Sequence, residues 1–352
     1  MKANCKPQLM KRFTVLLFLI WTVLSAAFSN VSRETAKMEH SFRNPSVAGM
    51  FYPSDPAKLH QNIISMFENT QKDSDSLKIP ARGIRMLIVP HAGYIYSGNT
   101  AAKAYSSIDE PEKVKRVILL GCHHRALVQG ATISPSTHYQ TPLGALALDL
   151  EQIRTLSSSS LITLARESDH SLEVQLPFLQ TLIGNDFKII PVLLGQMTQQ
   201  NIRDLGNLLA PLLNDETLLV ISSDFTHYGP RFGYSPFPPS SELLEKLDMG
   251  AIIEILALKP GNLENYCSRT GATICGAKAI ETGLHCVISA AACQKLTLAA
   301  KLLNYTTSSD ITGSFSESVS YAAIAVFSTT SNLESSDLNT VRPKEAPLGK
   351  AR

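Results

Sequence analysis

The sequence lacks the features that mark nucleic-acid-binding proteins. Its 32 Lys and Arg residues are nearly balanced by 30 Asp and Glu, which leaves a formal net charge of +2 over 352 residues. That balance gives no case for nucleic acid or a strongly anionic partner, and the sequence contains neither an RNA-binding signature nor a zinc-finger spacing. It also lacks internal repeats and long linkers. Because 44% of the residues are apolar, we expect a single domain with a substantial core.

The N-terminus differs from everything after it. Basic residues precede an apolar run over 13–24, and small residues follow at 25–29. This is the pattern of a secretory signal, and the run is shorter than the about 20 residues that a membrane span needs. We predict a signal peptide over 1–29, with an uncleaved membrane anchor as the alternative. The protein would then be exported (periplasmic or extracellular) or membrane-anchored, and cytoplasmic if this segment is not a signal.

Polar composition near both ends sets the predicted limits of the domain. Residues 30–43 are predicted to form a tether, 44–328 the folded domain and 329–352 a disordered tail. Any contact with a membrane would therefore come only through the N-terminal segment.

Short apolar segments alternate with helix-like segments along the predicted domain. The predicted strands cover 86–89, 116–120, 130–134, 188–194, 218–227 (polar at its end) and 319–327. The predicted helices cover 57–69, 101–105 with Thr100 as N-cap, a segment from 149, a segment opened by 168–178, 242–258 and 273–282; a turn-rich stretch covers 139–144. This alternation predicts a layered α/β/α domain with a central mixed sheet.

Histidines stand at the ends of three predicted strands. They are His91, the pair His123–His124, and His227. If these strands run parallel, the histidines meet at one edge of the sheet, which is where open α/β sheets bind ligands. Neutral imidazole is the commonest ligand of transition metals, so the pattern favours a metal site. General acid–base catalysis without a metal is the alternative.

Two carboxylates lie next to histidines in the sequence. Asp224 precedes His227 by three residues, and Asp169 directly precedes His170. Each carboxylate could orient an imidazole or cap a helix. For Asp169 we favour the cap, with Glu173 completing a capping box. His170 is then interpreted as a helix-start residue that packs on the turn.

The six cysteines match no disulfide scaffold, and one of them has a notable position. Cys275 precedes Gly276 at a predicted helix start, where the helix dipole and any nearby cation would lower the pKa of the thiol. A thiolate beside imidazoles would form a soft N/S site suited to Fe, Cu or Zn. A buried structural cysteine is the alternative, and the disulfide state stays open.

Taken together, these residues resemble the Memo family, which includes the bacterial proteins called AmmeMemoRadiSam system protein B. The resemblance extends from about residue 44 to 327. The matching motifs occur in the family's order and are Ala48-Gly-Met-Phe-Tyr52, Pro90-His-Ala-Gly-Tyr94, Tyr139-Gln-Thr-Pro-Leu143, Asp169-His-Ser-Leu-Glu173, Ser222-Ser-Asp-Phe-Thr-His-Tyr-Gly229, Thr273-Ile-Cys-Gly276 and Ser318-Val-Ser-Tyr-Ala-Ala323.

The resemblance implies a Memo-like domain with a fold similar to class III extradiol dioxygenases, which are non-haem iron enzymes. It implies metal ligands at His91, His124 and Cys275. His227 would lie nearby as a non-ligand or a fourth ligand, with Asp224 beside it. In a redox enzyme we expect these two residues to be catalytic, with His227 as the acid–base group. Because a cysteine stands in place of the carboxylate of a facial triad, ring cleavage does not follow from the fold.

One corner of the implied site departs from the family pattern. The family's usual Gly-Pro-Ser-His-His stands here as Gly121-Cys-His-His-Arg125. An ungapped alignment places the ligand at His124, with His123 in the position of the serine. Which of these two histidines is the ligand stays open.

Three functions remain open from the sequence. The first is a metal-dependent redox protein of unknown substrate that uses iron or copper, with zinc as a further option. The second is a non-enzymatic module that binds a ligand or a metal in a former dioxygenase pocket. The third is a metal-dependent hydrolase. The partner would be an unknown small molecule or peptide, and the family implies a pathway link to a radical-SAM protein and an AMMECR-like protein.

Overall fold

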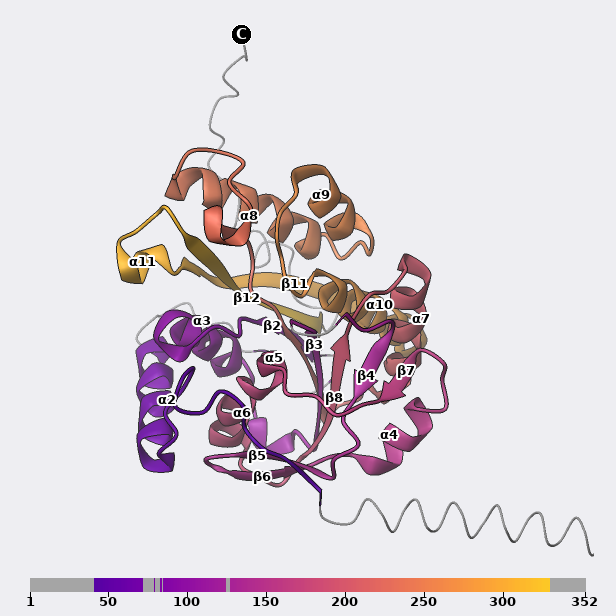
Figure 1. The fold of residues 1–352 in the computed structure, drawn as a ribbon. Helices are drawn as coiled ribbons and strands as arrows, with labels where there is room; N and C mark the ends of the chain where they lie inside the picture. Colours follow the sequence, from indigo (N-terminus) through magenta and orange to yellow (C-terminus); the bar gives the residue numbers. More distant parts are fainter. Residues whose placement is uncertain (1–40, 72–78, 80–82, 84, 125–126, 330–352) are drawn as a thin grey trace, which may run out of the picture.

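A mixed β-sheet forms the centre of the fold (Figure 1). The computed structural model describes residues 41–71, 79, 83, 85–124 and 127–329. The strands of the large sheet are β2 (Arg85–Val89), β3 (Arg116–Cys122), β4 (Ala131–Ile133), β7 (Ile162–Leu164), β8 (Lys188–Leu194), β9 (Thr217–Ser222), β10 (His227–Tyr228), β11 (Thr297–Thr307) and β12 (Ser318–Thr329).

The order of these strands is β10-β12-β2-β9-β3-β8-β4-β7, with β11 paired to β12 outside this path. The central strands β2, β9, β3 and β8 are parallel to one another, whereas β12 and β4 run antiparallel to their neighbours β2 and β8. The predicted α/β class with a central mixed sheet is therefore confirmed.

Helices cover the sheet on both faces, and this explains why its central strands are continuous apolar runs. The helices are α2 (Pro56–Gln71), α3 (Tyr94–Ser106), α4 (Leu150–Leu156), α5 (His170–Glu173), α6 (Leu176–Ile183), α7 (Gln199–Leu209), α8 (Ser241–Leu256), α9 (Asn262–Thr270), α10 (Ala277–Gln294) and α11 (Ser309–Thr312). Helices α2, α3 and α6 gather on one side of the sheet, and α7 and α10 gather on the other (Figure 1). Gly283 lets α10 lie directly on Met86 and Ile221, since a Cβ there would be 2.7 Å from Ile221.

A second, smaller sheet packs at the edge of the domain. It has the order β1-β5-β6 and consists of β1 (Phe42–Arg43), β5 (His138–Thr141) and β6 (Gly144–Ala147). The segment predicted as a turn-rich stretch is therefore mostly a β-hairpin. Tyr139 pairs with Leu146 across the hairpin and both side chains are buried, so tertiary burial decides its conformation.

Helix α3 begins at Tyr94, which corrects the predicted start at residue 101 with Thr100 as N-cap. The first backbone N–H of the helix, at Tyr94, donates to the carbonyl of Phe51 at 2.8 Å, so a distant segment satisfies the group that a local cap would serve. Gly98 consequently lies inside the helix and does not bend a loop. A Cβ at Gly98 would come within 2.7 Å of Met66 on α2, so this glycine permits close packing of two helices.

The ordered N-terminal strand begins before the predicted domain boundary at residue 44, because Phe42 and Arg43 pair with β5. At the other end β12 reaches Thr329. The predicted signal over 1–29, most of the tether and the tail after 329 lie outside the described residues. Among the described helices, none has the length and apolarity needed to cross a bilayer.

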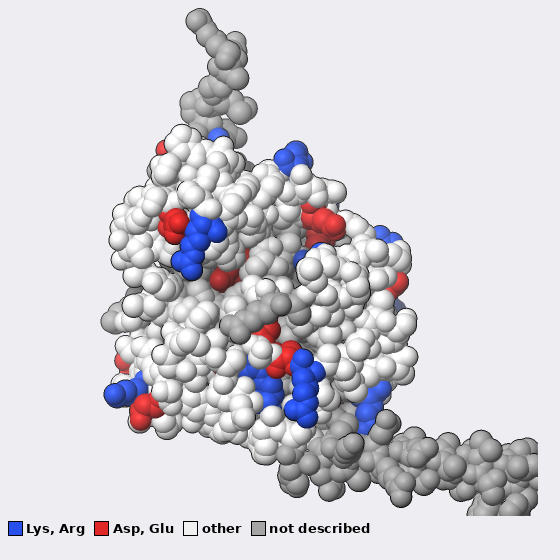
Figure 2. Space-filling model, viewed as in Figure 1, with Lys and Arg blue, Asp and Glu red and all other residues white. Residues whose placement is uncertain are grey.

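Charged side chains of both signs are interspersed on the face shown in Figure 2. Most of that face is uncharged, and acidic groups lie close to the basic ones. This view of the described residues therefore shows no extended region of a single sign.

A buried ion-pair network ties β1 to the segment that precedes α5. Arg43 lies between Glu167, 2.9 Å from its Nε, and Glu173, which accepts from its Nη1. The carboxylate of Glu173 also accepts bonds from the backbone N–H groups of Ser46 and Val47 at 2.7 and 2.9 Å. The predicted capping box at Glu173 is therefore wrong, because these partners occupy its carboxylate.

Burial of Glu173 disfavours its charged form, but Arg43 and the hydrogen bonds outweigh that effect and lower its pKa. A lowered folded-state pKa contributes stability that is fully present above the ordinary glutamate pKa of 4.5. That contribution is lost as the pH falls through the folded value.

We expect Glu173→Gln to reduce the free energy of unfolding by about 3 kcal/mol. Removing one partner of a buried ion pair typically costs about 3–5 kcal/mol, and the lower value applies here because Glu167 still faces Arg43. Urea unfolding at pH 7 measures the change. The difference from the unmodified protein should shrink below pH 4. The matched control is Glu110→Gln, which removes a solvent-exposed pair with Lys113 and should change stability by less than about 1 kcal/mol. Equal effects of the two substitutions would contradict this expectation.

Candidate metal centre

The ends of three neighbouring parallel strands bring the candidate residues together. Strand β9 lies between β2 and β3, with Ile221 paired to Ile88 on one side and to Leu120 on the other. The segments that follow these strands therefore leave the sheet at the same edge. The predicted convergence of the strand-end histidines on one edge is confirmed.

The ring of His91 is held in one orientation by the hydroxyl of Ser222. Ser222 Oγ donates its hydrogen to the carbonyl of Ser171 and accepts a bond from Gln175 Nε2 at 2.9 Å. The ring nitrogen Nδ1 of His91, 2.9 Å from the same oxygen, must therefore be the donor. This leaves the lone pair of Nε2 free, and Nε2 lies 3.3 Å from Cys275 Sγ.

The ring of His124 is fixed in the same manner by Asp169. The carboxylate accepts the backbone N–H of His124 at 2.7 Å and lies 3.1 Å from Nδ1. Burial would raise the pKa of Asp169, but these bonds and the one from the Ser171 N–H outweigh burial and lower it. The carboxylate is therefore ionised and can only accept hydrogen bonds. Nδ1 is then a donor to Asp169, and Nε2 is the nitrogen left to bind a metal once it has lost its proton. Asp169 is a helix cap, as predicted, and it also orients His124.

Cys275 lies in the loop that precedes α10, close against the end of β9. The backbone N–H of Asp224 donates to its Sγ at 3.2 Å, and the N–H of Gly276 donates to Ser223 Oγ at 3.0 Å. Gly276 permits this approach, since a Cβ there would be 2.5 Å from the Cβ of Ser223. Without this glycine the loop could not hold Cys275 at the sheet edge.

The pKa of the Cys275 thiol is opposite to the sequence-based expectation. Loss of solvent around the sulfur, together with the neighbouring Cys122, raises it to about 12, and the nearby His91 only partly offsets this. Desolvation disfavours a thiolate more strongly than the start of α10 favours it. In the metal-free protein Cys275 is therefore a protonated thiol at neutral pH.

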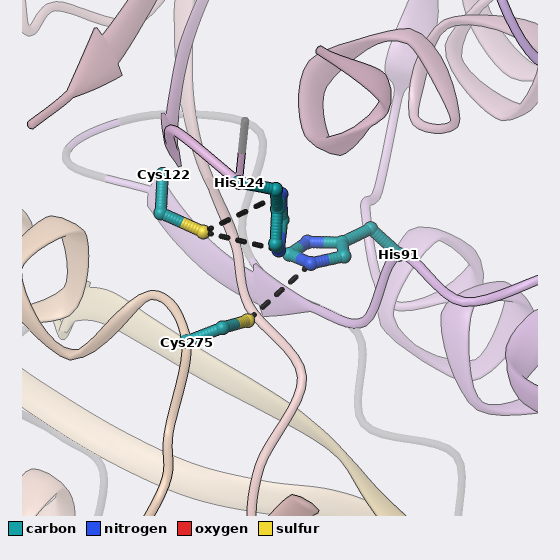
Figure 3. Close-up of side chains that lie close together, drawn as sticks. All are labelled: His91, Cys122, His124 and Cys275. Atoms are coloured by element: carbon teal, nitrogen blue, oxygen red, sulfur yellow. Dashed lines mark hydrogen bonds between the residues drawn. The ribbon is translucent and has the colours of Figure 1, made fainter. Parts of the chain in front are cut away.

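The structure brings four side chains together as a group that could hold a metal ion. They are His91, Cys122, His124 and Cys275, and one ligand atom from each lies within 4.8 Å of all the others. Figure 3 shows the two imidazoles and the two sulfurs pointing toward one another. Three of these are predicted ligands, and Cys122 is an addition that the sequence analysis did not assign.

His124, not His123, belongs to this group. His123 turns away from it and places Nε2 2.7 Å from Thr132 Oγ1. Arg125, the residue that departs from the family pattern beside it, lies outside the described residues. The five cysteines within the described ranges are free thiols, so both sulfurs of the group can bind a metal.

The donor atoms fit a four-coordinate ion. Bond lengths of about 2.3 Å to sulfur and 2.0–2.1 Å to nitrogen, at a tetrahedral angle, would place neighbouring S and N ligand atoms about 3.6 Å apart. The two S–N distances observed are 3.3 Å from Cys275 to His91 and 3.5 Å from Cys122 to His124. Only small side-chain shifts would therefore be needed to hold an ion.

His227 and Asp224 lie beside this group and not within it. A cavity of about 620 Å³ is lined by His227, Asp224, His91 and His124, together with aromatic side chains and Arg231. His227 Nδ1 donates to the carbonyl of Thr273 at 3.1 Å, which leaves Nε2 as an acceptor. Asp224 accepts the backbone N–H of His91 at 2.8 Å, so it positions the His91 loop. The orienting partner of His227 is Thr273, whereas the sequence had suggested Asp224.

His170 is the residue whose place the sequence analysis missed. Its ring stacks on that of His124 with centroids 4.5 Å apart, and it lines the same cavity as His227. Burial and the neighbouring His91 and His124 lower its pKa to about 4, so the ring is neutral at pH 7. Its Nδ1 is buried without a hydrogen-bond partner. The only local signal was its place at a helix start, which says nothing of this contact.

A second cavity adjoins the group from the side of the two sulfurs. Its volume is about 440 Å³, and its lining includes Cys122, His124, Cys275 and Lys278. The ammonium of Lys278 is held by Gln196 Oε1 at 2.9 Å. The metal-binding group thus lies between two cavities, one beside the imidazoles and one beside the thiols.

Comparisons with known proteins find similarity over most of the chain. A family model described as "Memo-like protein" matches residues 43–325. A "MEMO1 family protein" of Desulfurococcus amylolyticus is 35% identical over 295 residues, which cover 81% of this chain and 99% of the relative. The "Protein memo-1 homolog" of Caenorhabditis elegans is 34% identical over 301 residues, which cover 82% and 83%.

Among solved structures, an uncharacterized protein of Escherichia coli K12 aligns with a TM-score of 0.42 at 12% identity. That alignment covers 69% of this chain and 99% of the other.

We expect the affinity of this group for a metal ion to rise steeply with pH. Burial lowers the pKa of His124, but the bond to Asp169 and the contact with Cys275 outweigh it and raise the pKa to about 10. At neutral pH both His124 and Cys275 therefore hold protons that a metal must displace. Each displaced proton contributes about tenfold per pH unit, or about 100-fold for the two. Competition with a chromophoric chelator from pH 6 to 8 measures this slope, and a flat profile would sink the expectation.

Proposed function

The chain belongs to the Memo family, and from that premise we propose that it is a metal-dependent redox protein that holds iron or copper through His91, His124 and Cys275. The observation that carries the proposal is that the Nε2 of each imidazole lies beside a sulfur, while each ring is fixed through its Nδ1. Partners of this kind, behind the ligands, raise ligand basicity and set ring orientation in metal sites.

The donor set supports a redox-active ion. Imidazole suits iron, copper and zinc, and a thiolate shifts the preference toward softer ions. A bound iron or copper ion would supply one-electron chemistry at the edge of the sheet. Zinc would fit the same donors but could not change its oxidation state, so the identity of the metal decides between redox chemistry and hydrolysis.

The cavity of about 620 Å³ is the proposed place for a small molecule. His227 lines this cavity, and because its Nδ1 donates to the carbonyl of Thr273, Nε2 is the nitrogen left for a bound molecule. It would take up or return the proton of a bound molecule, while Arg231 at the same cavity would attract a negatively charged group. Asp224 would keep His91 in place through its backbone bond.

A second candidate function is a metal-binding module that performs no turnover. The observation that favours it is the presence of a second sulfur, Cys122, beside the three predicted ligands. Four protein ligands on one ion would leave a tetrahedral ion no open position for a substrate. Tight metal binding without oxidation or reduction of the bound ion would support this function.

We expect Cys275→Ser to lower metal affinity by at least about 100-fold. Loss of a residue that only hydrogen-bonds to a ligand typically costs about 10–100-fold, and Cys275 is itself a proposed ligand. Elemental analysis after anaerobic purification and chelator competition measure the effect. Stepwise oxidation and reduction of the bound ion, followed by optical spectroscopy, tests the redox part.

Two controls match this variant. Cys293→Ser removes an exposed thiol far along α10, and His227→Gln removes an imidazole of the cavity that lies outside the metal-binding group. Both should retain the metal content of the unmodified protein. An unchanged metal content in Cys275→Ser would overturn the ligand assignment, and a bound ion inert to oxidants and reductants would overturn the redox function.

A further inference from the structure

We propose that Cys122 is a fourth protein ligand of the same ion, so that the centre has two imidazole and two thiolate donors and is four-coordinate. The inference rests on the part of the proposed function that both candidates share, which is an ion bound by His91, His124 and Cys275, and it favours the second candidate because it fills the fourth position. It adds a ligand that the family resemblance does not supply, since the corresponding position in the family's usual motif is proline.

The backbone of Cys122 is held rigidly at the sheet edge. Cys122 is the last residue of β3, where it pairs with Leu194 on β8, and its carbonyl accepts a bond from Ser171 Oγ at 3.1 Å. The preceding Gly121 lets α5 pack on the strand end, since a Cβ there would be 2.7 Å from Leu172. Cys122 therefore presents its sulfur from a fixed strand end, as a ligand site of defined geometry requires.

The sulfur lies within reach of a fourth ligand position. Cys122 Sγ is 3.5 Å from His124 Nε2, the nitrogen on the far side of the ring from Asp169, and 4.0 Å from Nδ1, so it lies beside the ring and not on the line of the Nε2 lone pair (Figure 3). It also lies within 4.8 Å of the ligand atoms of His91 and Cys275. In a tetrahedral ion with these donors, S–N edges measure about 3.6 Å and S–S edges about 3.8 Å. One ion could therefore contact all four atoms once the Cys122 side chain rotates from beside the His124 ring to the front of Nε2.

The alternative is a thiol that donates a hydrogen bond to His124 Nε2 and takes no part in binding. That bond would occupy the lone pair that His124 needs as a ligand. Cys122 and His124 would then compete with the metal, whereas in the proposed arrangement the thiol loses its proton to solvent and both atoms face the ion. The two arrangements predict opposite effects when Cys122 is removed.

The fourth ligand has a consequence for the kind of ion. A tetrahedral centre with two sulfurs and two nitrogens suits a soft ion such as Cu(I), or Zn(II), better than Fe(II), which in facial-triad sites keeps open positions. Cys122 and Cys275 both line the cavity of about 440 Å³ that also contains Lys278. A small molecule in that cavity would reach the ion by replacing Cys122, the ligand on the open side.

The test uses Co²⁺ as a spectroscopic probe of the full chain. Thiolate-to-cobalt charge-transfer absorption grows with the number of thiolate ligands, and intense visible bands mark four-coordination. The unmodified protein should show the absorption of two thiolates. Cys122→Ala and Cys122→Ser should each lose about half of this absorption. Both variants should also bind Co²⁺, Zn²⁺ and Cu(I) at least about 100-fold more weakly, which is more than the loss expected when a residue that only hydrogen-bonds to a ligand is removed. Cys293→Ala is the matched control and should change neither quantity.

Unchanged charge-transfer absorption and affinity in both Cys122 variants would overturn the inference, as would tighter binding. X-ray absorption of the unmodified protein loaded with Cu(I) counts sulfur neighbours without any substitution, and a count of one would overturn it as well. Failure of the proposed function would give different results. In that case Cys275→Ser would leave the metal content unchanged, or the bound ion could not be oxidised or reduced.

Discussion

The parallel pairing of β2, β9 and β3 is the constraint on which the candidate centre depends. Adjacent strands in a sheet lie about 4.8 Å apart, so residues that follow three neighbouring parallel strands come within reach of one ion. His91 and Cys275 are separated by 184 positions in the chain and by 3.3 Å between Nε2 and Sγ. If one of these strands ran in the opposite direction, its histidine would lie at the other end of the sheet.

The buried polar groups around the centre hold the rings of His91 and His124 in place. Ser222 and Asp169 each use one oxygen to fix an Nδ1, and both also bond to the backbone of Ser171 at the start of α5. Arg43 reaches the same region, since its guanidinium donates to the carbonyl of Asp169 at 2.6 Å. A buried polar group without a partner is costly, so this network both stabilises the fold and orients the ligands.

The metal-binding group separates two environments. On the imidazole side, the larger cavity contains His227 and Arg231, groups that can move a proton or attract a negative charge. On the sulfur side, the smaller cavity contains Lys278 and both cysteines. The same ion could therefore meet different molecules from its two sides, and the coordination by Cys122 determines whether the second side is open.

The sequence by itself determined the sheet, its buried strands and most of the centre. Strand β8 covers the predicted 188–194, because a strand buried on both faces must be a continuous apolar run. His91 and Cys275 could be named as ligands from the family motifs, whereas the choice between His123 and His124 stayed open until the structure placed His124 in the group. Tertiary structure alone decided the start of α3, where Phe51 supplies the capping carbonyl, and the positions of Cys122 and His170. Those features depend on which distant groups satisfy a backbone N–H or face a ring, and local sequence carries no record of such partners.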